Sequence, residues 1–459
     1  MANYDLAIIG GGPGGYVAAI KAAQLGMKTV CIERDVLGGV CLNWGCIPSK
    51  SLIHNAEVLS TVNNAARYGI VTGAVTADYS VALQRSRKVV ERLTKGVTGL
   101  FKKNGVAHVH GQAQLVGPHT IAVGDTRIEA RNIIIATGAR PRLVPGIEID
   151  GTTVVTYREA ILQDTAPSDA VIIGGGAIGV EFGFIYNSYG AKVTIVESLP
   201  RIMAKEDDEI SSGLARSLRK QGIDILTDSR VTKIEKTGTG VIVHIATQDD
   251  NNLCIPADRV LISIGIIANI EDLGLASAGV EVENGFIKVD DHLRANDDGI
   301  YAIGDVTGKM PLAHVAQAQG IYAVETIAGH ETYPIDYMAV PRAVYSSPQV
   351  ASMGLSEREA AEQGIRVRVG KFPFLANGKA LALDAYEGFV KLIVDESTGE
   401  LLGAHLLGHE VTELLGELSL TRLMEGTSVE IGAVINAHPT LSEAIKEAAL
   451  AAEGRAVHG

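Results

Sequence analysis

The 459-residue sequence predicts an α/β protein in which one strand–helix–strand unit occurs twice and is followed by a separate α+β domain. Two observations predict the repeated unit: a buried strand, a glycine-rich turn, a helix and a second strand ending in acid occur at 4–34 and again at 169–197. The third observation is a change of character from about residue 340, where β-rich segments are followed by helices. At about 150 residues per domain, the length fits roughly three domains.

Both glycine-rich turns carry the pattern Gly-x-Gly-x-x-Gly at a fixed distance from an acid. The residues are Gly10, Gly12, Gly15 and Glu33 in the first unit, and Gly174, Gly176, Gly179 and Glu197 in the second. The first glycine and the acid are 23 residues apart in both units (33 − 10 and 197 − 174). In this motif the first glycine makes the turn, the second lets the backbone approach a pyrophosphate, and the third lets the helix pack on the strand. A single glycine turn can occur without a ligand, but the repeated pattern predicts two Rossmann-like dinucleotide-binding domains.

The acids at the ends of the second strands indicate which nucleotides are bound. Glu33 and Glu197 can accept hydrogen bonds from a ribose 2′-hydroxyl and would repel a 2′-phosphate. The second nucleotide is therefore expected to be NAD rather than NADP. The alternative is that either glutamate is a solvated strand end.

Domain boundaries are expected where buried strands run into Gly/Pro-rich segments. The strand in "RNIIIATGARPRLVPG" (131–146) ends in such a segment, and "DDGIYAIGDV" (297–306) contains a further strand. We predict that residues 1–147 and 270–339 form the first dinucleotide-binding domain. Residues 148–269 are predicted to form the second, and residues 340–459 the C-terminal domain.

Charge and hydropathy exclude several classes of partner. The formal net charge of −13 makes nucleic acid and anionic lipid surfaces poor partners. No apolar run approaches the roughly 18 residues that a membrane span needs. Since "MANYDLAIIG" enters a β-rich segment without a leader-like stretch, we expect a cytosolic protein or a mature organellar form.

The chain has four cysteines, far fewer than a disulfide-rich secreted scaffold. Cys31 and Cys254 lie in apolar, strand-like segments and are expected to be inert core thiols. Cys41 and Cys46 lie together in "GGVCLNWGCIPSK" (38–50). They could be a structural staple, half of a zinc site or a redox pair. No Cys/His cluster supplies further zinc ligands, so we expect no metal.

The local sequence constrains any bridge between Cys41 and Cys46. In an ideal helix, the Cα atoms of residues i and i+5 are about 8.6 Å apart, whereas a disulfide needs less than about 7 Å. A bridged segment therefore cannot be a regular helix, and Gly45 permits the distortion. The helix expected from "PSKSLIHNAEVLS" would place Cys46 at its positive end, near Lys50, where a thiolate is favoured.

The segment "GGVCLNWGCIPSK" resembles the active-site signature of the flavin-dependent disulfide reductases, most closely their dihydrolipoamide dehydrogenase branch. The resemblance covers nearly the whole chain. It includes "GGGPGG", "ATG" (136–138), "GGGAIG", "IYAIGD" (300–305), "PLAH" (311–314) and "AHPTLSE" (437–443).

The resemblance implies a relay from dihydrolipoamide through a Cys41–Cys46 disulfide and FAD to NAD. Cys41 would be the interchange thiol and Cys46 the thiolate beside the flavin. Lys50 would lie near flavin N5 and pair with Glu181. The implied cofactor contacts are Gly111, Gly138, Asp305 and Ala313 for FAD, and Val231 and Gly265 for NAD.

In the C-terminal domain the resemblance implies a base, His438, that is oriented by Glu443. In this family the base reaches the cysteines of the other subunit, so a homodimer is expected. A histidine that titrates near neutral pH can take a proton from dihydrolipoamide. The alternative for Glu443 is structural, because "TLSE" reads as a capping box with Thr440 at the N-cap, and both roles could hold.

The sequence departs from the family at two places. Asn436 stands where relatives often have a second histidine, and no arginine pair follows Gly265. The rival functions are a glutathione- or mercuric-reductase-like enzyme, or a non-catalytic nucleotide-binding scaffold with a structural disulfide. The expected partner is a lipoyl-bearing acyltransferase or a glycine-cleavage H-type protein.

Overall fold

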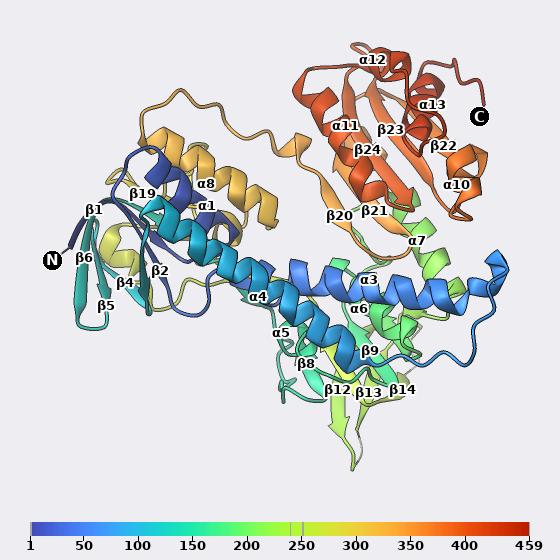
Figure 1. Cartoon of the computed structure of the whole chain (residues 1–459), viewed down its shortest axis with the longest axis horizontal. Coiled ribbons are helices and arrows are strands. Elements are labelled where there is room, and N and C mark those ends of the chain that lie inside the picture. The colour runs from blue at the N-terminus through green and yellow to red at the C-terminus, as the bar shows by residue number, and fades with distance from the viewer. Residues whose placement is uncertain (1, 239, 250–251, 459) are drawn as a thin grey trace.

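The structure, a computed structural model, describes residues 2–238, 240–249 and 252–458, and within these residues three large sheets occupy different regions (Figure 1). The N-terminal sheet lies at the left of the view, the central sheet at the bottom and the C-terminal sheet at the upper right. The long helices α3 (Cys46–Asn63) and α4 (Tyr79–Asn104) run between these regions.

The N-terminal sheet has the strand order β3-β2-β1-β6-β5-β4, with β19 beside β6. Its strands are β1 (Ala2–Ile9), β2 (Thr29–Glu33), β3 (Ala107–His110), β4 (Ala113–Gly117), β5 (Thr120–Val123), β6 (Thr126–Ile135) and β19 (Ile300–Ala302). Its helices α1 (Pro13–Gln24) and α8 (Ala313–Ile327) approach each other closely. A Cβ on Gly320 would come 2.7 Å from the carbonyl oxygen of Gly14, so glycine at this crossing allows the contact.

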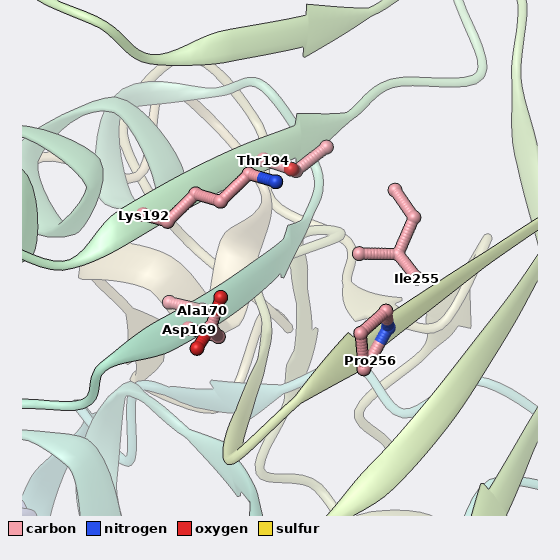
Figure 2. A pocket seen from close by; sticks show the side chains of 6 residues that line it. All are labelled: Asp169, Ala170, Lys192, Thr194, Ile255 and Pro256. Atoms are coloured by element: carbon pink, nitrogen blue, oxygen red, sulfur yellow. The ribbon is translucent and has the colours of Figure 1, made fainter.

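The central sheet is parallel, in the order β11-β10-β9-β15-β8. Its strands are β8 (Val154–Thr156), β9 (Asp169–Ile173), β10 (Lys192–Val196), β11 (Asp224–Leu226) and β15 (Arg259–Ile262), and its helices are α5 (Tyr157–Ala160), α6 (Ala177–Ser188) and α7 (Asp208–Lys220). The strands β12 (Arg230–Lys236), β13 (Val241–Ala246) and β14 (Asn252–Ala257) form a small antiparallel sheet beside it. Where β14 meets β9 and β10, they leave a cavity of only about 30 Å³ (Figure 2).

The C-terminal sheet is antiparallel, in the order β20-β21-β24-β23-β22. Its strands are β20 (Arg342–Val344), β21 (Gln349–Gly354), β22 (Val367–Pro373), β23 (Phe389–Asp395) and β24 (Leu401–Gly408). Its helices are α9 (Glu357–Glu362), α10 (Gly378–Ala382), α11 (Val411–Leu423), α12 (Ser428–Ala433) and α13 (Glu443–Ala452).

Short elements complete the chain. They are α2 (Gly39–Asn43), the strand pairs β7 (Ala139–Pro141) with β16 (Ile266–Ala268) and β17 (Val282–Glu283) with β18 (Phe286–Ile287), and the 3₁₀ turns η1 (Ala65–Tyr68), η2 (Leu275–Ala278), η3 (Gly304–Thr307), η4 (Tyr337–Ala339) and η5 (Phe374–Ala376).

The predicted fold class is confirmed, with two α/β units and a C-terminal α+β unit. After the central sheet the chain returns to the first one through β19 and α8. The residue limits of the three domains stay a prediction.

The two free cysteines differ in their surroundings. Cys31, on β2, is fully buried, and burial raises the pKa of its thiol far above the ordinary range, as expected for an inert core thiol. The same expectation for Cys254 is wrong, because Cys254 is exposed on β14. That strand is covered on one face only, which its apolar composition does not reveal. Among the described residues, no helix combines the length and apolar character needed to cross a membrane.

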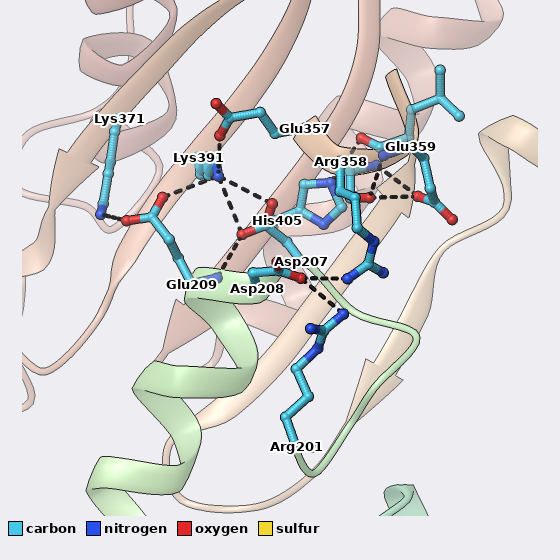
Figure 3. A network of polar contacts seen from close by, with 12 residues as sticks. Arg201, Asp207, Asp208, Glu209, Glu357, Arg358, Glu359, Lys371, Lys391 and His405 are labelled. Atoms are coloured by element: carbon cyan, nitrogen blue, oxygen red, sulfur yellow. Dashed lines mark hydrogen bonds and ion pairs between the residues drawn. The ribbon is translucent and has the colours of Figure 1, made fainter. Parts of the chain in front are cut away.

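A buried ammonium group joins the C-terminal sheet to the start of α7 (Figure 3). The side chain of Lys391, on β23, is 2% exposed, and its Nζ lies 3.0 Å from Asp207 Oδ2, 3.0 Å from Glu209 Oε2 and 2.8 Å from Glu357 Oε2. Burial alone would lower the pKa of Lys391, but its hydrogen bonds to these three carboxylates raise it well above the ordinary value. Burial would likewise raise the pKa of Asp207, yet the charges of His405 and Lys391 lower it.

We predict that Lys391→Met destabilises the protein by about 3 kcal/mol, because Asp207 would be left buried without its cation. The outer pair between Lys371 and Glu209 is exposed, so Lys371→Met should cost less than about 1 kcal/mol. Urea midpoints of the two variants, measured in parallel, provide the comparison. A double variant Lys391→Met/Asp207→Asn should recover part of the loss, whereas equal midpoints for both single variants would contradict the prediction.

The pH dependence of this loss follows from the directions of the two pKa shifts. Lys391, with its raised pKa, contributes stability that is lost only above its unfolded-state pKa of about 10.4. Asp207, with its lowered pKa, contributes stability that is lost as the pH falls below about 3.9. In Lys391→Met, burial without the cation raises the pKa of Asp207, so protonation relieves part of the penalty. The difference between the wild type and Lys391→Met should therefore be largest between about pH 7 and 9 and shrink as the pH falls.

Candidate active site

Cys41 and Cys46 form a disulfide at a break between two helices. Cys41 lies in α2, Trp44 and Gly45 interrupt the helix, and Cys46 is the first residue of α3. Their Cα atoms are 4.6 Å apart, well below the spacing of an ideal helix. A Cβ at position 45 would come 3.1 Å from the carbonyl oxygen of Val40, so glycine fits the tight connection that the bridge requires. Cys46 lies at the positive end of an 18-residue helix, where a thiolate is stabilised.

Side chains that the sequence did not indicate hold this break in place. Asn43 Nδ2 donates to the carbonyl oxygens of Leu37 (3.2 Å) and Gly39 (2.9 Å), and Arg87 Nη1 donates to the carbonyl oxygen of Asn43 at 2.6 Å. The guanidinium of Arg158 stacks on the Trp44 ring, 4.1 Å from the ring centroid. Arg87 and Arg158 are distant from the cysteines in sequence, so only the folded chain reveals their role.

Lys50 is paired with a nearly buried carboxylate from the central domain. Lys50 Nζ lies 2.9 and 2.8 Å from the two carboxylate oxygens of Glu181, whose side chain is 8% exposed. The backbone N–H of Tyr345 donates to the same carboxylate at 3.0 Å, and the ammonium lies over the Tyr345 ring. The structure therefore brings together Lys50 and Glu181 as the resemblance implied, and adds Tyr345 to the pair. One turn separates Lys50 from Cys46 along α3.

The first glycine loop is closed by its own acid. The backbone N–H of Gly11 donates to Glu33 Oε2 at 2.6 Å. A Cβ on Gly15 would come 1.9 Å from the carbonyl oxygen of Gly10, which explains the third glycine, whereas a Cβ on Gly12 would meet only the Cα of Gly39, at 3.9 Å. A Cβ on Gly39 would come 2.7 Å from the Cα of Gly12, so the cysteine segment packs directly on this loop.

The second loop repeats this geometry. The backbone N–H of Gly175 donates to Glu197 Oε2 at 2.7 Å, and a Cβ on Gly179 would come 2.0 Å from the carbonyl oxygen of Gly174. Nothing lies within 4 Å of a Cβ built on Gly176. Each carboxylate offers more lone pairs than the loop uses, so both Glu33 and Glu197 retain acceptor capacity for a ribose hydroxyl.

The other predicted cofactor contacts lie where parallel strands end. In the N-terminal sheet, one predicted contact lies at or just beyond the carboxyl end of each of β1, β2, β3, β6 and β19; in that order they are Gly10, Glu33, Gly111, Gly138 and Asp305. Ala313 is the first residue of α8. In the central sheet Gly174, Glu197 and Gly265 follow β9, β10 and β15, and Val231 lies in β12, after β11. The carboxyl edge of a parallel sheet is where nucleotides bind.

Asp305 provides a direct test of whether this edge fits a flavin nucleotide. Burial raises the pKa of its carboxyl above the ordinary value. Among the described residues, no side chain and no backbone N–H donates to it. A half-buried acceptor without a protein donor suits the hydroxyl groups of a bound ligand. The glycine loop and the first turn of α1 suit its pyrophosphate, so the residues present fit FAD.

His438 and Glu443 are in contact with each other but not with the cysteines. His438 Nδ1 lies 2.9 Å from Glu443 Oε1, and the His438 side chain is 79% exposed. In the part of the chain that the structure describes, no contact joins His438 to Cys41 or Cys46. Figure 1 shows α12 and α13, which flank His438, at the top of the C-terminal domain, remote from the start of α3.

The expected capping box at Thr440 is wrong in detail. Helix α13 begins at Glu443 with Ser442 at its N-cap, and the Thr440 hydroxyl donates to the carbonyl oxygen of Ala437 instead. Glu443 Oε2 nevertheless accepts the backbone N–H of Thr440 at 2.8 Å, leaving Oε1 for His438. The hydrogen bond from Thr440, and then that from His438, lower the pKa of Glu443. Glu443 therefore holds the backbone of Thr440 and the ring of His438 at the same time.

The two loops allow a matched prediction. Gly15→Ala should weaken flavin retention by about tenfold or more, since its Cβ meets a carbonyl oxygen that cannot yield without moving the loop. Gly179→Ala should retain flavin and raise the KM for NAD by a similar factor. Flavin absorbance per chain and NAD saturation curves separate the two effects. Gly96→Ala on α4, where a Cβ meets nothing within 4 Å, is the control, and loss of flavin in Gly179→Ala would contradict the assignment.

Comparisons with known proteins agree with this geometry. Residues 4–320 match the family described as pyridine nucleotide-disulphide oxidoreductase, and residues 340–449 match the dimerisation domain of that family. The chain is 46% identical to a dihydrolipoyl dehydrogenase of Rhizobium etli and 43% identical to one of Bacillus subtilis, each over 99% of both chains. A crystal structure of LpdA from Mycobacterium tuberculosis superposes with a TM-score of 0.90 at 28% identity, over 98% of this chain and 99% of the other. The HOCl-induced disulfide reductase RclA of Escherichia coli has a TM-score of 0.86 at 29% identity, over 96% and 98%.

Proposed function

Since the chain belongs to the pyridine nucleotide-disulphide oxidoreductase family, we propose that it oxidises dihydrolipoamide to lipoamide and passes the electrons to NAD. Its full-length relatives at 43–46% identity are dihydrolipoyl dehydrogenases, which makes it an NAD-dependent oxidoreductase with FAD. The observation that carries the proposal is the Cys41–Cys46 disulfide, which lies one helical turn from the Lys50–Glu181 pair in a segment whose Gly39 packs on the first dinucleotide loop.

The two cysteines perform thiol–disulfide exchange. A thiolate of dihydrolipoamide attacks Cys41 Sγ, the Cys41–Cys46 bond breaks, and Cys46 leaves as a thiolate at the N-terminus of α3. The second thiol of the substrate then attacks the mixed disulfide, which releases lipoamide and leaves both cysteines reduced. When bound, FAD supplies the two-electron carrier between this dithiol and NAD.

We infer that Lys50 lies beside the flavin and that Glu181, with the N–H of Tyr345, holds its ammonium in place. Three bonds to one nearly buried carboxylate leave the lysine little freedom. Glu33 and Asp305 are proposed to bind FAD with Gly10, Gly12, Gly15, Gly111, Gly138 and Ala313. Glu197 is proposed to bind NAD with Gly174, Gly176, Gly179, Val231 and Gly265. The proposed domain limits are 1–147 with 270–339, 148–269, and 340–459.

We propose that His438 acts as the base in a homodimer, at the cysteines of the second chain. The match to a dimerisation domain supports the dimer, and the exposure of His438 leaves its ring free to reach another chain. Large apolar side chains nearby are exposed in the single chain, among them Leu423 (75%) and Ile435 (94%). Burying such side chains would stabilise an interface. Glu443 fixes the tautomer so that Nε2 can accept the substrate proton.

The proposed physiological partner is a lipoyl-bearing acyltransferase or a glycine-cleavage H-type protein, and the proposed compartment is the cytosol. Both follow from the reaction class and from the low cysteine content rather than from a docking surface. A lipoyl group on a mobile arm suits a disulfide that must exchange with a second protein.

The test is an anaerobic titration of the purified holoenzyme with dihydrolipoamide, followed by addition of NAD. A long-wavelength absorption band from a thiolate beside oxidised flavin should appear, and NADH should then form. Glutathione with NADPH and mercuric ion with NADPH are the rival substrate pairs, and turnover with either in place of dihydrolipoamide would overturn the proposal. A protein that does not bind flavin would support the scaffold alternative.

A further inference from the structure

The small sheet β12–β13–β14 has one apolar face and one polar face. On β13, Val243 is buried and pairs with Ile255 of β14, and both belong to the core between this sheet and the central sheet. Figure 2 shows Ile255 lining the cavity across from β9 and β10. Because side chains alternate along a strand, the neighbouring residues His244 and Cys254 point to the opposite face.

Three strands bring a thiol, an imidazole and a carboxylate into line on that face. His244 and Cys254 are directly opposite in the β13–β14 register, and Cys254 Sγ lies 3.4 Å from His244 Nδ1. The other ring nitrogen, Nε2, lies 3.3 Å from Glu235 Oε2 of β12. Lys233 Nζ lies 2.8 Å from the same carboxylate oxygen, which restrains Glu235. A nucleophile beside a base, with a carboxylate at ion-pair distance from the base, is an arrangement that can activate a thiol.

This face is reachable from solvent. Cys254 is exposed, and the His244 side chain is 32% exposed. Figure 1 shows β12, β13 and β14 at the bottom of the molecule, whereas the C-terminal sheet with its dimerisation-domain match is at the upper right. Since no grouping of three or more His, Cys, Asp or Glu suited to a metal ion occurs among the described residues, a metal does not account for the arrangement.

We propose that Cys254, His244 and Glu235 form a second thiol site, at which small disulfides of the glutathione type exchange with Cys254. This site, named here the outer thiol site, uses neither FAD nor the Cys41–Cys46 pair, so it is independent of the function proposed above. His244 Nδ1, which faces Cys254 Sγ, is the ring nitrogen placed to take the thiol proton, and the Glu235 carboxylate 3.3 Å from Nε2 favours the imidazolium that forms.

The exchange is balanced in atoms and electrons. His244 Nδ1 takes the proton of Cys254, and the sulfur attacks one sulfur of the small disulfide. That disulfide bond breaks as the new one to Cys254 forms, and the departing thiolate takes the proton from His244. Cys254 is oxidised to a mixed disulfide while one small thiol is released.

The test treats the oxidised holoenzyme with glutathione disulfide and follows the mass of each chain with peptide mapping. We expect one glutathionyl group per chain, on Cys254, because Cys31 is buried and Cys41–Cys46 is closed. Cys254→Ser should lose the adduct and keep its NAD-reducing activity. His244→Asn should form the adduct at least about threefold more slowly than the wild type near neutral pH. It should reach the wild-type rate only at a higher pH.

Two comparisons make the result specific to the outer thiol site. Glu235→Gln should slow the reaction in the same direction but less than His244→Asn, since it removes only the negative charge beside the imidazole. His119→Asn, an exposed histidine in the turn after β4, should react as the wild type does. The proposal is overturned if Cys254 forms no adduct, or if His244→Asn matches the wild type at every pH while unfolding at the same temperature.

Discussion

Replacing Cys46 by serine should lower dihydrolipoamide-dependent NADH formation by roughly a thousandfold or more, since a nucleophilic pair cannot work with one sulfur missing. The structure makes this effect specific. Cys46 is the first residue of α3 and is bonded to Cys41, so its loss removes the leaving group of the first exchange step. Serine is nearly isosteric and should leave the helix break intact. The long-wavelength band expected from a thiolate beside flavin should also be absent.

The control for Cys46→Ser is a reaction that does not need the disulfide. Electron transfer from NADH to ferricyanide should remain near the wild-type rate in the variant, which would show that flavin and NAD are still bound. Cys254→Ser, on the outer face of β14, should keep full activity with dihydrolipoamide. Retention of more than about a tenth of that activity in Cys46→Ser would contradict the relay.

The second large effect is expected from mixing two inactive chains. His438→Ala should reduce activity by about a hundredfold or more, because the substrate proton would have no acceptor. Cys41→Ser should be inactive as well. If His438 acts on the cysteines of the other chain, a heterodimer of the two variants contains one complete site, and it should recover up to about half of the wild-type activity.

The heterodimer is obtained by co-expressing the two variants with different affinity tags and purifying over both. Activity should rise above the sum of the two homodimers. No recovery would place His438 at the cysteines of its own chain, which would conflict with its position between α12 and α13. A heterodimer of His438→Ala and Glu443→Gln is the matched control. Both changes affect the His438–Glu443 pair, so each of its two sites lacks one member of that pair and no complete site can form.

Much of the nucleotide-binding geometry could be predicted from the sequence, because it depends on backbone conformations that few residues allow. Gly10 has a φ of +108° and Gly174 a φ of +109°, a conformation that favours glycine. The equal sequence spacing from each glycine to its acid lets the acid accept a hydrogen bond from the backbone of the loop. The break between Cys41 and Cys46 was predictable for the same reason, since helix geometry and a disulfide are incompatible at that spacing.

The two errors have different causes. Cys254 is predicted in the core because its strand is apolar, but burial depends on which face of that strand a distant sheet covers. The Thr440 cap is predicted because "TLSE" has the right spacing, but a carbonyl three residues earlier competes for the hydroxyl. One face of β14 is covered by the central sheet and the other is open, and the Thr440 hydroxyl finds the carbonyl of Ala437 in the turn that leads into α13.

The sequence by itself determined the fold class, the two glycine loops with their acids and the segment that carries the disulfide, because these follow from local conformational preferences and fixed spacings. Only the tertiary structure decided which distant groups meet. Lys50 pairs with Glu181 across 131 residues, Lys391 is buried against Asp207 across 184, and His438 lies apart from the cysteines of its own chain. These contacts arise from the packing of the sheets and of α3 on α6, and no local pattern encodes that packing.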